Sequence, residues 1–348
     1  MSPYILATLL FGLGLGTTIT FASSHWLLAW MGLELNTLAI IPLMAQFHHP
    51  RAVEATTKYF LTQAAAAATL LFASITNAWL TGQWEICQLS HPIPITMITL
   101  ALALKIGLAP LHAWLPEVLQ GLDLTTGLIL STWQKLAPFA LLLQIQPTIS
   151  NILVFLGLLS MLVGGWGGLN QTQLRKILAY SSIAHLGWMV LILQFSPHLT
   201  LLALLLYLIM TTSMFMVFKV NKATNINTLA TSWAKAPALT TLTPLILLSL
   251  GGLPPLTGFM PKWLILQELT KQELAPTATI AALTALLSLY FYLRLSYAMT
   301  LTTSPNNLTG TTPWRLYSSQ LTLPLAISTT LAICMLPLTP GVMALLTT

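Results

Sequence analysis

Apolar stretches of about 20 residues recur along the whole of this 348-residue chain. A helix of about 20 apolar residues spans the hydrocarbon core of a bilayer. The chain is 56% hydrophobic and 6% charged, with a mean hydropathy of +0.81, so it lacks the polar surface that a soluble protein of this length needs. The sequence therefore predicts an all-α polytopic membrane protein with about eleven transmembrane helices. The predicted spans cover residues 3–22, 26–46, 57–80, 93–121, 124–146, 150–169, 177–195, 200–218, 239–271, 276–300 and 321–346.

Two of these spans, 93–121 and 239–271, are longer than a bilayer requires, and prolines interrupt both of them near the middle. The interruptions read KIGLAPLHAWLP in the first span and GGLPPLTGFMPKW in the second. A proline inside a helix removes a backbone hydrogen bond and breaks or kinks the helix. Each segment could therefore be one broken crossing or two short crossings.

The positions of the cations between the spans favour single crossings. Lysine and arginine collect in short loops on the non-translocated side of a membrane. If every span crosses once, the linkers on the N-terminal side hold Arg51, Lys58, Arg175, Lys176, Lys219, Lys222, Lys235 and Arg315. The opposite side holds Lys271. Splitting either long span would remove this asymmetry, so we expect both to cross once, with the N-terminus on the non-translocated side and the C-terminus on the other.

The two broken spans also indicate an internal repeat. Each is the fourth member of a group of five, and because five is odd, the two groups would be inserted upside down relative to each other. The sequence thus predicts two inverted five-helix repeats in residues 1–147 and 148–300, followed by a linker and a C-terminal helix in 301–348. In transporters built on this plan, the broken helices lie at the binding site.

Four charged side chains lie inside the apolar stretches, namely Glu34, Lys105, Lys135 and Lys262. A charge in the middle of a membrane costs about 2.5 kcal/mol or more, so such residues usually have a function. Lys105 precedes the first break and Lys262 follows the second, which places both at the predicted binding sites. Three simpler explanations compete: a buried ion pair that only fixes helix register, lysines with a purely structural role, and, for Lys262, an ammonium group that reaches back to the headgroups.

Two histidines and two acidic residues also lie within or beside the apolar spans. His112 follows Lys105 by seven residues, so the two share a helix face if the helix continues past the break, and His185 falls in the middle of its span. A lone histidine on an apolar face is often an ordinary core residue, so both explanations stay open for each histidine. Glu117 and Asp123 are expected to be charges at a helix end or at the membrane rim.

These residue types suit proton transfer. A buried lysine beside a carboxylate holds its proton and releases it when the carboxylate moves away or another cation approaches. A glutamate followed by several lysines can therefore pass protons by successive electrostatic pushes, with Ser, Thr, Gln and trapped water bridging the gaps. No redox group is required for this process.

Other chemistry finds little support in the sequence. Cys87 and Cys334 are isolated thiols, too few for an iron–sulfur cluster, and neither a metal-ligand cluster nor a phosphate loop nor a nucleophile–base motif is evident. The glycines of GLGLG at 12–16 lie inside an apolar span, where close helix packing is expected. The net charge of +6 comes from cations in the linkers, which orient the chain in a membrane. The sequence therefore predicts no bound cofactor, no metal and no nucleic-acid partner.

Five strings carry a resemblance to a known family. They are MGLELNTLAIIPLM at 31–44, ALKIGLAPLHAWLPEVLQG at 103–121, TWQKLAP at 132–138, RKILAYSSIAHLGWM at 175–189 and GGLPPLTGFMPKW at 251–263. On these strings the chain resembles the NADH dehydrogenase subunit 2 family, the antiporter-like membrane subunits of mitochondrial respiratory complex I, and the similarity runs along its whole length.

The resemblance implies a role for each polar residue. Glu34 matches the glutamate that pairs with the broken-helix lysine, here Lys105, while Lys135 matches the central lysine and Lys262 the lysine of the second broken helix. His112 and His185 match positions in a water-filled polar axis that carries protons. These matches are what the resemblance adds to the residue patterns described above.

The resemblance also implies a setting for the chain. It would be a proton-translocating subunit of NADH:ubiquinone oxidoreductase in the mitochondrial inner membrane, with its N-terminus in the matrix and its C-terminus in the intermembrane space. Its partners would be lipid and the other hydrophobic subunits, and NADH and ubiquinone would be used by the whole complex. Two alternatives are a free-standing cation/proton antiporter and a passive structural or assembly subunit.

Overall fold

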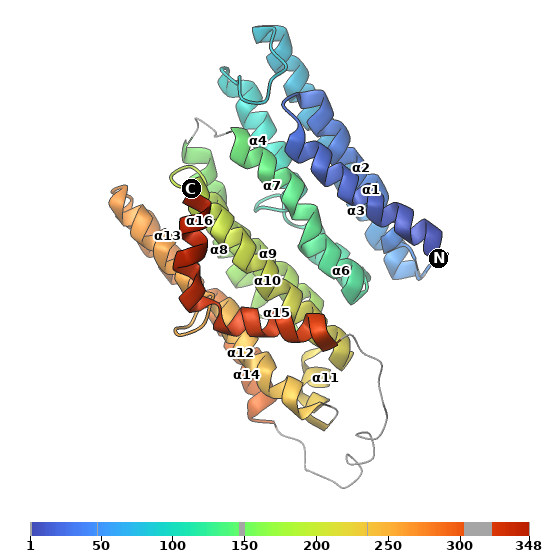
Figure 1. Cartoon of the computed structure of the whole chain (residues 1–348), viewed down its shortest axis with the longest axis vertical. Helices are drawn as coiled ribbons and strands as arrows, with labels where there is room; N and C mark the ends of the chain where they lie inside the picture. The colour runs from blue at the N-terminus through green and yellow to red at the C-terminus, as the bar shows by residue number, and fades with distance from the viewer. Residues whose placement is uncertain (1, 47, 146–149, 235, 303–321, 348) are drawn as a thin grey trace. The chain divides into compact units, whose positions relative to one another are not determined.

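The computed structural model describes residues 2–46, 48–145, 150–234, 236–302 and 322–347, and all the regular elements in these ranges are helices (Figure 1). Contacts divide the chain into two compact units, Met1–Ser160 and Met161–Thr348. The predicted linker cations Lys235 and Arg315 lie outside the described residues.

The described residues of the first unit form seven helices and the beginning of an eighth. They are α1 (Pro3–Ala22), α2 (Trp26–Met44), α3 (Pro50–Thr81), α4 (Pro92–Ile106), α5 (Trp114–Gly121), α6 (Leu124–Ser131), α7 (Trp133–Ile145) and α8 (Ser150–Gly168), which continues into the second unit. α1 packs along α2, α3 packs against α2, α4 and α5, and α7 contacts α1, α2 and α4. Residues from α2, α3, α4, α5, α6 and α7 together surround the candidate site.

Glycines allow the close contact between α1 and α2. A Cβ atom on Gly16 would collide with the Asn36 side chain, and one on Gly32 would lie 2.6 Å from the Thr20 methyl carbon and 2.8 Å from the Gly16 carbonyl oxygen. Small residues permit such close approach of helix backbones in a membrane. The packing role expected for GLGLG is confirmed at Gly16.

The second unit contains the remaining helices. They are α9 (Leu174–Ile192), α10 (Pro197–Asn221), α11 (Ile226–Ala230), the 3₁₀ helix η1 (Thr231–Ala234), α12 (Pro237–Gly251), α13 (Phe259–Lys271), α14 (Ala275–Thr300), α15 (Thr322–Cys334), the 3₁₀ helix η4 (Leu336–Leu338) and α16 (Thr339–Thr347). α10 is the central helix, because it contacts α9, α12, α13, α15 and α16.

The described helices confirm a multi-span membrane protein. Seven segments are long and apolar enough to cross a bilayer, namely α1, α2, α3, the α6–α7 pair, α8, α10 and α14, and an eighth is the bent pair α15–α16. α4 and α12 are shorter apolar helices of 15 residues each. The number of eleven crossings, the inverted repeat and the domain limits stay predictions.

Both predicted breaks are present, and they share a local design. α4 ends at Ile106 and α12 at Gly251, and each is followed by a left-handed glycine, Gly107 with φ +88° and Gly252 with φ +78°. The amides of Gly107 and the next residue both bind the Ala103 carbonyl at 2.9 Å. A proline follows three residues after each glycine, so the chain has a glycine that ends the helix and a proline that cannot continue it.

The structure corrects four local expectations. The span predicted at 124–146 is present as one apolar segment over Leu124–Ile145, but its helix is interrupted at Thr132, between α6 and α7. The last predicted span bends by 71° where α15 ends, because Pro337 and Pro340 follow. The predicted linker 219–238 contains the short helices α11 and η1. Several predicted linker cations belong to helices instead: Arg51 and Lys58 to α3, Arg175 and Lys176 to α9, and Lys219 to α10.

Candidate functional site

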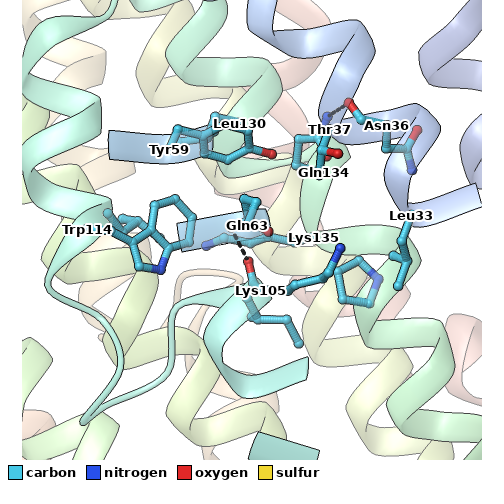
Figure 2. A pocket seen from close by; sticks show the side chains of 13 residues that line it. Leu33, Asn36, Thr37, Tyr59, Gln63, Lys105, Trp114, Leu130, Gln134 and Lys135 are labelled. Carbon is cyan, nitrogen blue, oxygen red and sulfur yellow. Dashed lines mark hydrogen bonds between the residues drawn. The ribbon is translucent and has the colours of Figure 1, made fainter. Parts of the chain in front are cut away.

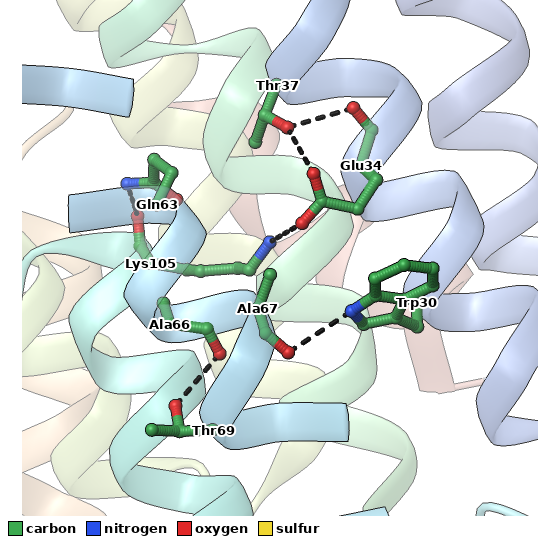
Figure 3. A network of polar contacts seen from close by, with 8 residues as sticks. All are labelled: Trp30, Glu34, Thr37, Gln63, Ala66, Ala67, Thr69 and Lys105. Atoms are coloured by element: carbon green, nitrogen blue, oxygen red, sulfur yellow. Dashed lines mark hydrogen bonds and ion pairs between the residues drawn. The ribbon is translucent and has the colours of Figure 1, made fainter. Parts of the chain in front are cut away.

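The ion pair between Glu34 of α2 and Lys105 of α4 is the central polar contact of the first unit (Figure 3). The Glu34 Oε1 and Lys105 Nζ atoms are 4.0 Å apart, and the two side chains are 25% and 2% exposed. The Thr37 hydroxyl lies 2.9 Å from the Glu34 backbone oxygen and 3.1 Å from Glu34 Oε2, so its one hydrogen is shared between these two acceptors. At 4.0 Å the ammonium is paired in charge but too distant for a hydrogen bond.

Lys105 lies at the carbonyl end of α4 because this helix stops at the first break, directly after Ile106. Lys105 lies in the last turn of α4, where helix carbonyls carry partial negative charge that favours a cation. Two side chains from other helices bind the carbonyls of this turn: Trp114 Nε1 donates to Leu104 O at 3.1 Å, and Gln63 Nε2 donates to Lys105 O at 3.4 Å. Trp114 also meets the buried Tyr59 edge to face, with ring centroids 5.7 Å apart.

Lys105 and Lys135 line one cavity of about 20 Å³ (Figure 2). This volume is roughly what one water molecule needs. Lys135, on α7, is 3% exposed. Pro138 also lines the cavity, and because it has no amide hydrogen, the Gln134 carbonyl lacks its usual helical donor. The cavity therefore brings two buried lysines and weakened helix backbone together.

Neutral polar side chains complete the wall of this cavity, and the sequence analysis did not single them out. They are Asn36, Thr37, Tyr59, Gln63 and Gln134. Gln134 Nε2 donates to the backbone oxygen of Asn36 at 3.1 Å, which ties α7 to α2. An amide side chain within an otherwise apolar span could have indicated these residues in the sequence. Gln134 is the clearest case, because it directly precedes Lys135.

Lys262 binds backbone rather than a carboxylate. Its Nζ donates to Gly251 O at 2.7 Å and lies 3.4 Å from Leu250 O, both at the carbonyl end of α12. A Cβ atom on Gly252 would lie 2.8 Å from Lys262 Cδ and 2.9 Å from Nζ. Glycine is thus required at 252 for its positive φ and for the space that the lysine occupies. The ammonium points back to the break and not outward along α13.

Lys262 and His185 line a second cavity of about 20 Å³. Its wall comes from α9, α10, the second break and α13. The His185 ring lies 5.7 Å from the ring of Tyr207, which is fully buried on α10. The structure thus brings the predicted residues of the second unit together at one cavity.

His112 does not share a helix face with Lys105, because the helix ends at Ile106 and His112 lies in the break. Its Nδ1 atom is 3.2 Å from Pro110 O, and the side chain is half-buried. His112 does not line the cavity that Lys105 and Lys135 share. Sequence spacing failed here because a helical face exists only while the helix continues.

Glu117 lies at the surface, as expected of a rim charge. Lys58 Nζ is 2.7 Å from Glu117 Oε2 and 2.8 Å from Glu54 Oε1, and the two glutamates are more than half exposed. Asp123 occupies the N-cap of α6. Neither acidic residue reaches the cavities.

Within the described residues, no group of three or more His, Cys, Asp or Glu side chains could hold a metal ion. Cys87 and Cys334 are free and exposed. The lysines Lys105, Lys135 and Lys262, one histidine and neutral groups line the described cavities, and the Glu34 carboxylate lies beside the first of them.

Comparison with known proteins gives the class of this chain. A family model described as NADH:quinone oxidoreductase/Mrp antiporter, TM matches residues 23–288, and one described as NADH dehydrogenase subunit 2 C-terminus matches 289–343. The fold and the matched model define an antiporter-like membrane subunit.

Relatives narrow the class to one family. NADH-ubiquinone oxidoreductase chain 2 of Tetraodon nigroviridis is 78% identical over 345 residues, which are 99% of each chain, and that of Salmo salar is 74% identical over 348 residues, the whole of both. The chain belongs to the NADH dehydrogenase subunit 2 family.

Solved structures share the fold. A chain of respiratory complex I from Thermus thermophilus with bound aureothin matches with a TM-score of 0.86 at 27% identity, covering 99% of this chain and 80% of that one. An archaeal membrane-bound sulfane sulfur reductase matches with a TM-score of 0.87 at 19% identity, which is evidence for the fold alone.

Proposed function

We propose that this chain is a proton-translocating membrane subunit of NADH:ubiquinone oxidoreductase in the mitochondrial inner membrane. It works among the other hydrophobic subunits and lipid, and the whole complex uses NADH and ubiquinone. The chain itself binds no redox cofactor, metal or nucleic acid. Its N-terminus faces the matrix and its C-terminus the intermembrane space.

The observation that carries the proposal is the Glu34–Lys105 pair beside a cavity that Lys135 also lines. The carboxylate balances one buried ammonium, but two ammonium groups at one cavity repel each other. A proton arriving at Lys135 would therefore weaken the hold of Lys105 on its own proton. Movement of Glu34 would have the same effect.

The proposed path continues at the second unit with Lys262 and His185, while His112 would serve at the first break. At Lys262 the carbonyl end of α12 takes the place of a carboxylate, since the partial negative charge of a helix C-terminus favours a cation. The two lysines beside the breaks thus have different counter-charges.

The direct test is proton pumping per NADH oxidised in membranes with assembled complex that carries Lys135→Met. We expect pumping to fall while the amount of assembled complex is kept, because methionine fills similar space without a charge. Normal pumping would instead favour a passive structural subunit. Cation/proton exchange by the isolated chain in proteoliposomes would favour a free-standing antiporter.

A further inference from the structure

A side chain from the second break, the segment 252–258 between α12 and α13, binds the carbonyl end of α15. The last four carbonyls of a helix have no helical donor, and inside a membrane such groups need a partner from the protein. Ala332 is one of these four residues, and its oxygen accepts from the Thr257 hydroxyl at 2.5 Å. Both residues are buried, with exposures of 0% and 1%.

Thr257 is tightly connected to the rest of the break. The next residue, Gly258, lies so close to α12 that a Cβ atom there would collide with the Ser249 carbonyl oxygen. α13 begins one residue later, and Lys262 reaches back from its first turn to Gly251 O. The close contact at Gly258 and the start of α13 leave the chain little freedom between Thr257 and Lys262. A shift of Thr257 would therefore also move Lys262.

We propose that the C-terminal helix α15 clamps the second break, and that the Thr257–Ala332 hydrogen bond holds Lys262 at the carbonyls of α12. Thr257 is a positioning residue in this scheme. α15 also packs on α12, which ends at the break, and on α10, which lines the cavity of Lys262. The part of the inference that concerns proton transfer by Lys262 rests on the function proposed above.

The clamp joins two parts of the chain that match different family models. The break lies in the region matched by the antiporter model, whereas Ala332 lies in the region matched by the subunit 2 C-terminus model. In this family the position of the lysine at the second break, here Lys262, would then depend on a segment outside the region matched by the antiporter model.

Three variants isolate the hydrogen bond. Thr257→Val keeps the shape of the side chain but leaves the Ala332 carbonyl buried without this donor, and Thr257→Ser keeps the donor. Thr284→Val is the matched control, because buried Thr284 donates to Ala281 O within its own helix, at 2.8 Å, and joins no second element.

The first readout is amide hydrogen exchange of the segment 252–262 in assembled complex. We expect exchange about five-fold faster in Thr257→Val, the factor that corresponds to loss of one ordinary hydrogen bond. Thr257→Ser and Thr284→Val should exchange as the unchanged complex does. Unchanged exchange in Thr257→Val, or an equal rise in Thr284→Val, would overturn the clamp.

A second variant serves if Thr257→Val complex does not accumulate. Thr257→Cys places a weaker donor at the same position. Its exchange rate should then lie above that of Thr257→Ser. A rate equal to that of Thr257→Ser would overturn the proposal.

Pumping per NADH separates the clamp from the function of Lys262. We expect a loss in Thr257→Val that Thr257→Ser restores, and a larger loss in Lys262→Met. Normal pumping in Lys262→Met would refute the role of that lysine, while the exchange data would still decide the clamp. Loss in Lys262→Met with normal pumping in Thr257→Val would refute the positioning role.

Discussion

Replacing Glu34 by Gln removes the charge that balances buried Lys105 with almost no change in shape. At the observed 4.0 Å, two unit charges attract by about 4 kcal/mol at an effective dielectric constant of about 20. Because a quarter of the Glu34 side chain is exposed, we halve this value to about 2 kcal/mol. That energy corresponds to a factor of about 30 in a rate or an equilibrium.

The assay is a double-mutant cycle on NADH oxidation coupled to proton pumping, normalised to assembled complex. Glu34→Gln and Lys105→Met should each impair pumping. The double variant should retain about 30 times more activity than the product of the two single losses, because no unpaired charge stays buried. Multiplicative losses, with no recovery in the double variant, would refute the coupling.

The chain supplies its own control in the pair of Lys58 and Glu117. Their charged atoms are closer, at 2.7 Å, but the side chains are 42% and 53% exposed. Exposed pairs contribute little because water screens them. The cycle of Lys58→Met and Glu117→Gln should therefore show a coupling below that of the buried pair, despite the shorter distance.

Three further outcomes follow from the structure. Gly252→Ala should displace Lys262 and lower pumping in assembled complex, and unchanged pumping would contradict the need for space there. Gly16→Leu should reduce the yield of assembled complex, measured on native gels, because α1 and α2 could not approach; an unchanged yield would count against this packing. In a chain whose exposed Cys87 and Cys334 are first replaced by Ser, an impermeant thiol reagent should label exposed Thr228→Cys from the matrix side and not from the intermembrane space, and the reverse pattern would overturn the proposed orientation.

Local patterns in the sequence were enough to place most helices and both breaks. Hydropathy marks an apolar run, glycine followed by proline ends a helix, and neither signal depends on distant residues. The same holds for the candidate charges, since a lysine within an apolar span is visible in the sequence without knowledge of its neighbours. The interruption at Thr132 was not predicted, because neither glycine nor proline stands at that position.

Only the tertiary structure decided which groups meet. Lys105 pairs with the Glu34 carboxylate, whereas Lys262 donates to backbone carbonyls, although both lysines lie next to similar breaks. That difference depends on how neighbouring helices are rotated and how closely they pack, which residue spacing within one helix does not encode. The same reason explains why the Thr257–Ala332 contact could not be predicted: it joins residues 75 positions apart, and its acceptor became available through a bend in α15–α16 that the hydropathy pattern does not reveal.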